Sequence, residues 1–314
     1  MILTVTMNPS IDISYQLEEL MSNTVNRTAE VIKTAGGKGL NVTRVLKELG
    51  ADVTATGLLG GFHGAFIQHQ LDNLKITSDF SLIQQETRNS IAIMHGGAQT
   101  EILESGPVVE KDEGNLFYQN YLKQIKEADF VTISGSLPRG LASGYYEKLI
   151  IAANEQQVPV LLDTSGNALQ HCLEAESKPF LIKPNLEELS ALVNNGQLIN
   201  SLEDLKRVLA QELFTGIPWI VVSLGGEGAF VKKDERYYRV NIPKINVVNP
   251  VGSGDATIAG LAYGLTTKKK VVDIVKTAMT CGILNALESH TGSINVEKFA
   301  AIYQQVEVVP YKES

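Results

Sequence analysis

The sequence predicts an α/β fold of three layers, in which helices cover both faces of a doubly wound, mostly parallel β-sheet. Two observations predict it. Short apolar runs rich in β-branched residues alternate along the chain with longer helical patterns, as in repeated βα units. Several of these runs are apolar at every position, which is typical of strands that are covered by helices on both faces.

Six segments have the pattern of buried strands, and six have the pattern of helices. We expect the strands at residues 2–7, 52–60, 130–136, 158–165, 180–185 and 219–225. We expect the helices at residues 40–50, 143–157, 185–195, 202–214, 255–267 and 271–289. No internal repeat, low-complexity tract or linker interrupts this order. The sequence therefore favours one domain over residues 1–314.

Two regions depart from the βα alternation. Residues of about 10–35 and 87–105 contain strand-like sequence without crossover helices, and RNSIAIMH-GGAQ-TEILESG has the pattern of a hairpin with Gly96 and Gly97 in its turn. We interpret these regions as a small antiparallel sheet, a discontinuous β-lid added to the main domain. An extension of the main sheet's edge explains the same pattern, and the sequence alone does not separate the two.

Composition bounds the class of protein. The net charge of −8 argues against a nucleic-acid partner, because such partners usually need a basic face. No stretch approaches the ~18 to 20 unbroken apolar residues of a membrane span, and the first residues lack the pattern of a secretion signal. Cys172 and Cys281 lie far apart and offer neither a disulfide framework nor a metal knuckle. We expect a reduced, cytoplasmic location.

The segment NPVGSGDAT, residues 249–257, is the strongest candidate for chemistry. Gly252 and Gly254 flank Ser253 directly before a helical pattern, so the backbone can turn sharply and approach a ligand. The first helical turn presents unpaired N–H groups and the positive end of the helix dipole, which suit a phosphoryl group and favour an ionised Asp255. Asp255 could then accept the proton of an attacking hydroxyl. On spacing alone, a helix start capped by Asp255 explains the segment better.

A second glycine segment, TAGGKGLNV, occupies residues 34–42. It is not a Walker A loop, because Lys38 is followed by Gly39 rather than by Ser or Thr. A sugar site lined by backbone, with Asn41 as a ligand for a hydroxyl, fits the pattern. An ordinary strand-to-helix turn fits it equally well.

Two further segments follow predicted strands. In KPNLEEL, Asn185 and Glu188 lie one helical turn apart and form a polar cluster where α/β sheets bind ligands, although a capping box explains them without a ligand. In SLGGEGAF, residues 223–230, the glycines could surround nucleotide phosphates, although a hairpin turn explains them as well.

Five cationic side chains could supply positive potential in this acidic chain. They are Arg27, Lys38, Arg88, Arg139 and Lys183. Each one taken singly is more often a solvated surface residue. Arg139 is the most suggestive, because SGSLPRG directly follows a buried strand. The five histidines have no metal-like spacing.

With these segments in order, the chain resembles the ribokinase-like sugar kinases of the PfkB family. The order is Asp12 near the first strand, GGKGLN, SGSLP, KPNxxE, SLGxxG and GSGD. The resemblance covers essentially the whole chain and implies a ribokinase-like fold. Within the family, the stretches TAGGKGLNVTRVL, ETRNSIAI, TEILESGP and YYRVNIPKINVVNPVGSGDAT are most similar to members that phosphorylate tagatose 6-phosphate.

The resemblance implies roles on the acceptor side. Asp255 would abstract the proton from a sugar hydroxyl, and the backbone of Gly252, Ser253 and Gly254 would form an anion hole for the γ-phosphoryl group. The sugar would be held by Asp12, Gly37, Lys38 and Asn41. The sugar's own phosphate would be bound by Arg88, Ser136 and Arg139, with Arg27 contributed by a partner subunit of a homodimer formed through the lid.

The resemblance also implies roles on the nucleotide side. The ATP phosphates would be contacted by Lys183, Ser223, Gly225 and Gly228. Asn185 and Glu188 would organise Mg²⁺ through water, since Mg²⁺ keeps much of its hydration. Asn285 would border the adenine. One departure from the family is Asn249, where many relatives have Asp or Thr.

The resemblance implies transfer of a phosphoryl group from ATP to the C1 hydroxyl of D-tagatose 6-phosphate, which gives tagatose 1,6-bisphosphate. A 1-phosphofructokinase or a 6-phosphofructokinase of the same family is the nearest alternative, because tagatose and fructose differ only in configuration at C4. A catalytically inactive nucleotide-binding regulator is a second alternative. A Rossmann oxidoreductase is disfavoured, since MNPSID does not supply the GxGxxG that should follow the first strand.

Overall fold

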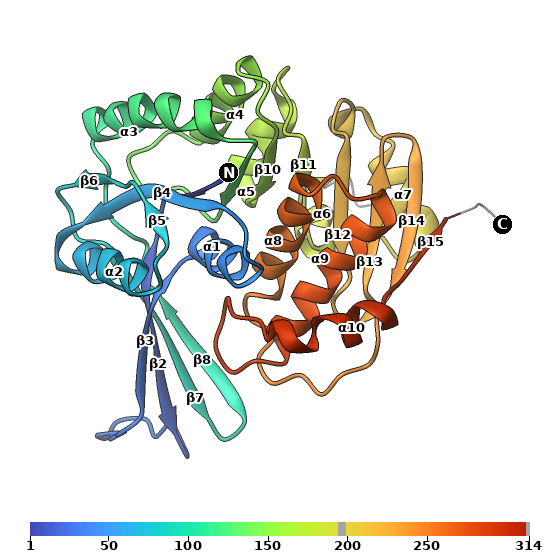
Figure 1. The fold of residues 1–314 in the computed structure, drawn as a ribbon. Coiled ribbons are helices and arrows are strands. Elements are labelled where there is room, and N and C mark those ends of the chain that lie inside the picture. The colour runs from blue at the N-terminus through green and yellow to red at the C-terminus, as the bar shows by residue number, and fades with distance from the viewer. Residues whose placement is uncertain (194–198, 312–314) are drawn as a thin grey trace.

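The computed structural model describes residues 1–193 and 199–311, which form a large sheet between two helical layers and a smaller sheet beside it (Figure 1). The large sheet has the strand order β15-β14-β13-β12-β11-β10-β9-β1-β4-β5, and β6 also pairs with β4. Pairing is parallel from β12 to β5 and antiparallel from β12 to β15. The predicted mostly parallel α/β fold is confirmed.

The strands of the large sheet are short, and their carboxyl ends meet along one edge wherever they are parallel. The parallel strands are β1 (Ile2–Thr6), β4 (Val53–Gly60), β5 (Thr77–Ser78), β6 (Ser81–Ile83), β9 (Phe130–Ser134), β10 (Val160–Asp163), β11 (Leu181–Ile182) and β12 (Trp219–Ser223). The antiparallel ones are β13 (Ala229–Lys233), β14 (Arg236–Asn241) and β15 (Glu307–Pro310).

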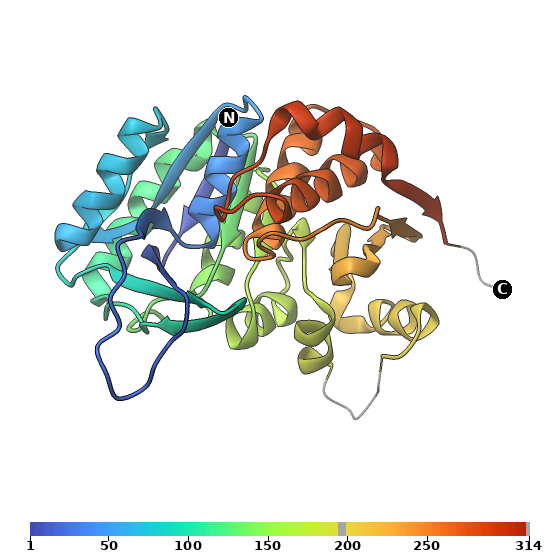
Figure 2. The ribbon, with the colours of Figure 1, turned by 90° about the horizontal axis from the view of Figure 1, so that it is seen from below.

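Helices cover the large sheet on both faces, as the view from below shows (Figure 2). One layer holds α3 (Lys111–Gln124), α4 (Tyr145–Glu155), α5 (Gly166–Glu174), α6 (Leu186–Leu192) and α7 (Leu202–Leu209). The other holds α1 (Lys38–Glu48), α2 (Gly61–Asn73), α8 (Ser253–Thr266), α9 (Val271–Ala286) and α10 (Phe299–Gln305). Short 3₁₀ turns lie at Ile125–Glu127, Glu212–Phe214, Gly225–Glu227 and Val296–Lys298. Alternate residues of β1 face the two cores, with Leu3 and Val5 on one and Ile2 on the other.

The smaller sheet projects from one end of the molecule (Figure 1). Its strands are β2 (Ser10–Leu17), β3 (Val31–Gly36), β7 (Arg88–His95) and β8 (Ala98–Leu103), in the order β3-β2-β7-β8. The predicted hairpin is confirmed, with Gly96 and Gly97 at positive φ in its turn. The two outer pairs are antiparallel as predicted, whereas the central strands β2 and β7 pair in parallel. These strands form a separate sheet rather than an extension of the main one.

The predicted strands and helices are present, with most ends shifted by one to four residues. The helix predicted at 185–195 is found as α6, which ends at Leu192, and positions 194 and 195 of the prediction lie outside the described residues. The sequence patterns did not single out α2, α3, α5 or α10. None of the helices in the described ranges is long and apolar enough to cross a membrane.

Helices α8 and α9 pack more closely than ordinary side chains permit. A Cβ placed on Gly260 of α8 would lie 2.6 Å from the Cα of Ala278 and 3.0 Å from the carbonyl oxygen of Thr277. The absence of a side chain at Gly260 therefore sets the approach of the helix that begins with the GSGD segment.

We expect Gly260→Ala to destabilise the protein, although alanine favours a helix by about 1 kcal/mol over glycine. The steric clash with α9 is with backbone, so overpacking should dominate and lower the free energy of unfolding by about 1 to 3 kcal/mol. Urea denaturation measures this. Gly226→Ala is the control, because a Cβ there meets no atom within 4 Å. An unchanged or raised stability of Gly260→Ala would contradict the packing argument.

Candidate active site

The strands of the large sheet bring polar groups to one edge. Thr6, Ser134, Asp163 and Ser223 end their strands there, and Lys183 follows directly after β11. In doubly wound sheets ligands bind outside the carboxyl ends of the strands. The side chains that follow are therefore placed by backbone topology, not by proximity in the sequence.

The GSGD segment forms the start of α8. Gly252 is the N-cap residue, with φ of 84° in the left-handed region that glycine tolerates, and Ser253 begins the helix. Asp255 is thus the third helical residue and not the cap, so the capping interpretation of Asp255 is wrong. Asp255 is 5% exposed. The segment presents the first backbone N–H groups of a long helix next to a buried acid.

The environment of Asp255 opposes its ionisation. Burial and the nearby carboxylate of Asp163 raise the pKa of Asp255 to about 7, against the effects of Lys38, of a hydrogen bond from Asn41 and of Lys183. The expectation that the helix dipole keeps Asp255 ionised is outweighed by this desolvation. A pKa near neutrality is the value that suits a general base at physiological pH.

Two lysines share the buried carboxylate of Asp163. Lys183 Nζ lies 3.4 Å from Asp163 Oδ1, and Lys38 Nζ lies 3.7 Å from Asp163 Oδ2. Lys183 is 6% exposed, and its Nζ lies 3.1 Å from where a Cβ of Gly254 would be. The desolvation cost of burying these charges is therefore offset by ion pairing. The pairing also leaves two cations next to the helix start, where a phosphoryl group would need them. Asp163 was not among the predicted site residues, although its strand ends in the polar sequence DTS.

A small polar cavity of about 180 Å³ lies beside this charge cluster. It is lined by Thr6, Asn8, Lys38, Arg88, Ser134, Gly135, Ser136, Thr164 and Ser165. In the described part of the chain, seven buried side-chain oxygens have no hydrogen-bond partner, and four of them belong to residues of this lining. These are Thr6 Oγ1, Asn8 Oδ1, Ser134 Oγ and Thr164 Oγ1. Buried polar atoms usually find partners, so the cavity suits a ligand rich in hydroxyl groups.

Three of the residues predicted to bind the acceptor line this cavity. They are Arg88, Ser136 and Lys38. Arg88 donates to the carbonyl oxygens of Asn8 and Glu104, and Arg139 donates to that of Gly106. The two arginines thus hold the segment that follows β8.

The remaining predicted acceptor residues lie on β2, in the loop after β2 and at the start of α1. Burial raises the pKa of Asp12, which accepts a hydrogen bond from Ser10 at 2.7 Å. Gly37 is the N-cap residue of α1, at φ of 102°. The side-chain amide nitrogen of Asn41 donates a hydrogen bond to Asp255 Oδ2, at 2.7 Å. Arg27 is exposed in the loop between β2 and β3, and its contact with the site of a partner subunit stays a prediction.

A larger cavity of about 640 Å³ lies on the other side of the helix start. Its polar lining includes Asn185, Ser223, Gly225, Gly228, Ser253 and Gly254. Its apolar walls are formed by Ile242, Ile245, Val247, Met279, Ile283 and Ala286. An apolar cleft that ends at backbone N–H groups and glycine turns fits a nucleotide, with the base between the walls and the phosphates at α8.

The predicted place of Asn285 beside the adenine needs correction. Asn285 is fully buried and does not line this cavity. Its amide donates to the Val251 carbonyl at 2.8 Å and accepts from the Gly292 backbone at 2.8 Å. On α9 the cavity is lined at positions 279, 282, 283 and 286, which share one helical face, whereas 285 lies on another.

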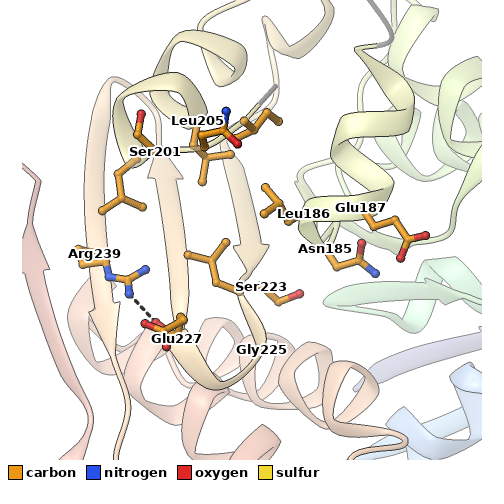
Figure 3. A pocket seen from close by; sticks show the side chains of 13 residues that line it. Asn185, Leu186, Glu187, Ser201, Leu205, Ser223, Gly225, Glu227 and Arg239 are labelled. Carbon is orange, nitrogen blue, oxygen red and sulfur yellow. Dashed lines mark hydrogen bonds between the residues drawn. The ribbon is translucent and has the colours of Figure 1, made fainter. Parts of the chain in front are cut away.

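A third cavity, of about 630 Å³, lies beside the turn after β12 and shares Asn185, Ser223, Gly225 and Glu227 with the second cavity (Figure 3). Leu186 and Leu205 line it, together with Arg239, which donates to the Glu227 carbonyl at 2.6 Å. The start of α8 does not line it. The second cavity, which the start of α8 lines, therefore fits a nucleotide better than the third.

Asn185 and Glu188 form the capping box that the sequence allowed as an alternative. Asn185 Oδ1 accepts from the Glu188 backbone at 2.7 Å, and Glu188 Oε2 accepts from the Asn185 backbone at 2.9 Å. Within residues 1–193 and 199–311, no three His, Cys, Asp or Glu side chains are grouped so as to hold a metal ion. One carboxylate and one amide oxygen fit an ion that keeps most of its water ligands, as Mg²⁺ does.

Comparison with known proteins agrees with this geometry. The chain matches the model for the pfkB family of carbohydrate kinases over residues 5–298. Tagatose-6-phosphate kinases from two strains of Staphylococcus epidermidis are 50% identical over 309 residues, which is 98% of this chain and 99% of theirs. The structure of phosphofructokinase-2 from Escherichia coli in complex with fructose-6-phosphate has a TM-score of 0.87 at 27% identity, over 96% of this chain and 98% of that one.

The chain belongs to the pfkB family of carbohydrate kinases, as the ordered motifs indicated. It is a phosphotransferase with an alcohol group as acceptor.

The raised pKa of Asp255 predicts an acid limit to activity. A base acts when ionised, so kcat/KM should fall about tenfold per pH unit below roughly pH 7, as Asp255 becomes protonated. Asp163→Asn removes the like charge and should move this limb to lower pH. The acceptor's own phosphate titrates identically with both proteins, so the difference between the two profiles reports on Asp255. Superimposable profiles would contradict the prediction.

Proposed function

We propose that this protein transfers the γ-phosphoryl group of ATP to the C1 hydroxyl of D-tagatose 6-phosphate, giving D-tagatose 1,6-bisphosphate and ADP. The observation that carries the transfer chemistry is Asp255, a buried acid with its pKa raised to about 7. It follows Ser253 and Gly254, which line the larger cavity, and it is an electrostatic neighbour of Lys38, which lines the smaller one. The substrate is supported by the tagatose-6-phosphate kinases that are 50% identical to this chain.

The reaction follows from the placement of the charges. Asp255 accepts the proton of the acceptor hydroxyl as its oxygen forms a bond to the γ-phosphorus and the bond to the ADP oxygen breaks. The backbone N–H groups of Gly252 and Gly254 would bind the transferred group as an anion hole. The N–H of Ser253, which donates to the Pro250 carbonyl at 3.3 Å in this structure, would join them by turning to the phosphoryl group. Lys183 lies against Gly254 and neutralises charge on the phosphates. Ser223, Gly225 and Gly228 line the path of the nucleotide phosphates.

Mg²⁺ would be held through water by Asn185 and Glu188, and when bound it would neutralise phosphate charge. The Glu188 carboxylate is near enough to Lys38 to contribute to raising the pKa of that lysine. The acid that would organise the ion and the lysine beside the acceptor cavity are thus parts of one electrostatic environment.

The smaller sheet would act as a lid of a single domain. It carries Asp12 and Arg88 at the ends of β2 and β7 that adjoin the site. Closure would exclude water, which would otherwise accept the phosphoryl group. Exposed apolar side chains on this sheet, Ile32, Ile102 and Leu103, favour its use as the interface of a homodimer, in which Arg27 reaches the partner's site. A cytoplasmic location suits these phosphorylated substrates.

A phosphofructokinase activity is the second candidate, favoured by the likeness to the Escherichia coli phosphofructokinase-2 in complex with fructose-6-phosphate. The two sugars differ at one stereocentre, and a single hydrogen bond can decide between them. A 1-phosphofructokinase activity is a further alternative among the sugar-phosphate kinases.

Replacing the base should abolish most of the turnover. We expect Asp255→Asn to lower kcat by about 10² to 10⁴-fold, because the hydroxyl keeps its proton during attack. ATP affinity, measured by calorimetry, should change little, since the nucleotide cavity is not lined by Asp255. Glu187→Gln is a control, because this acid on α6 does not line either of the two proposed substrate cavities. Near-normal turnover of Asp255→Asn would rule out its role as the base.

The acceptor is identified by a coupled ADP-release assay. The panel contains tagatose 6-phosphate, fructose 6-phosphate, fructose 1-phosphate and the free sugars. We expect the largest kcat/KM with tagatose 6-phosphate, and free sugars should react poorly because Arg88 and Arg139 would lack a phosphate to bind. A larger kcat/KM for either fructose phosphate would overturn the substrate and leave the kinase activity intact.

A further inference from the structure

Arg44 is a half-buried cation on α1, next to the active site. Its guanidinium donates to the side-chain oxygen of Asn41 at 2.6 Å and to the carbonyl oxygens of Thr291, Gly292 and Ala35. Burial lowers the pKa of Arg44, and the carboxylates of Asp12, Glu48 and Asp255 oppose that shift. Arg44 lines neither the acceptor cavity nor the nucleotide cavity.

The contact with Arg44 decides which way the Asn41 amide faces. A guanidinium has only donors, so the oxygen of Asn41 must be the atom that faces it. The amide nitrogen of Asn41 then points to Asp255 and donates to Oδ2 at 2.7 Å. A donor on one carboxylate oxygen favours the ionised form and leaves Oδ1 as the acceptor for the substrate's hydroxyl.

The loop that receives Arg44 also holds the anion hole. A Cβ on Gly292 would lie 2.8 Å from Asn41 Cα and from Arg44 Nη2, so the loop lies directly on this pair. The Gly292 backbone also donates to Asn285 Oδ1, and Asn285 Nδ2 donates to the Val251 carbonyl, immediately before the GSGD segment. Arg44 thus ties α1, the base and the start of α8 to one loop.

We propose that Arg44 is a positioning residue for the phosphoryl transfer, which acts by fixing the Asn41 amide so that its N–H₂ group, and not its oxygen, faces the Asp255 carboxylate. The inference rests on the proposed role of Asp255 as base. Without Arg44 the amide is free to turn, and an oxygen facing Asp255 would repel the ionised carboxylate. The other charged groups acting on Asp255 are Asp163 on β10, Lys38 on α1 and Lys183 after β11.

The test is the titration of Asp255 itself, which needs no activity. ¹³C-carboxyl NMR of labelled protein would follow the pKa, with Asp255→Asn identifying the resonance. We expect Arg44→Met to raise the pKa of Asp255 by about one unit, the size of a lost charge-assisted hydrogen bond, and to move the acid limb of kcat/KM equally. Arg44→Lys keeps a donor for Asn41 and should restore part of the shift. Lys47→Met, an exposed position on the same helix, is the matched control.

A double-mutant cycle separates orientation of the amide from the charge of Arg44 alone. Asn41→Leu removes the amide, so adding Arg44→Met to it should shift the pKa of Asp255 little further. If the two pKa shifts are fully additive, the proposal is overturned, because Arg44 then acts only by its charge. An unchanged pKa in Arg44→Met, with kcat lowered equally at every pH, would also overturn it. If Arg44→Met does not fold, the pKa of Asp255 is measured in Arg44→Lys and in Asn41→Leu instead. A pKa equal to that of the wild type in both variants would contradict the proposal. Undiminished turnover of Asp255→Asn would instead refute the proposed function.

Discussion

The burial of one carboxylate, Asp255, is the constraint on which the site depends. An isolated ion at 5% exposure would be costly, and the fold offsets the cost with Lys38 and Lys183 while Asp163 keeps those cations in place. The balance raises the pKa of Asp255 to about 7. The same burial that disfavours the charged base thus gives it the affinity for a proton that catalysis needs.

Different elements of the fold form the two cavities proposed for the two substrates. Strands β1, β9 and β10 end in the hydroxyl-lined cavity, whereas β12 and the helices α8 and α9 line the cleft with apolar walls. Asp163, at the end of β10, pairs with Lys38, which lines the first cavity, and with Lys183, which follows β11. The small sheet adds Arg88 to the first cavity, so the acceptor's phosphate and its hydroxyl can be bound by different elements.

The alternation of strands and helices, the hairpin of β7 and β8 and the order of the glycine segments could be predicted from the sequence, because they depend on local patterns. Side-chain direction could not. Asn285 was expected beside the adenine and is instead turned into the protein. Asn185 and Glu188 do form a capping box, so a local explanation and a functional one apply to the same residues. Arg44 and Asp163 owe much of their importance to partners far away in the sequence, Thr291 for Arg44 and Lys38 for Asp163.

The central claim is that Asp255 meets the acceptor hydroxyl at the point where the helix start binds the transferred group. A crystal structure with tagatose 6-phosphate and a non-hydrolysable ATP analogue tests it most directly. The account predicts the C1 hydroxyl within about 2.6 to 3.2 Å of Asp255 Oδ1, with the γ-phosphoryl group at the backbone of residues 252–254. An acceptor hydroxyl held by another side chain, with Asp255 in contact with no substrate atom, would contradict it.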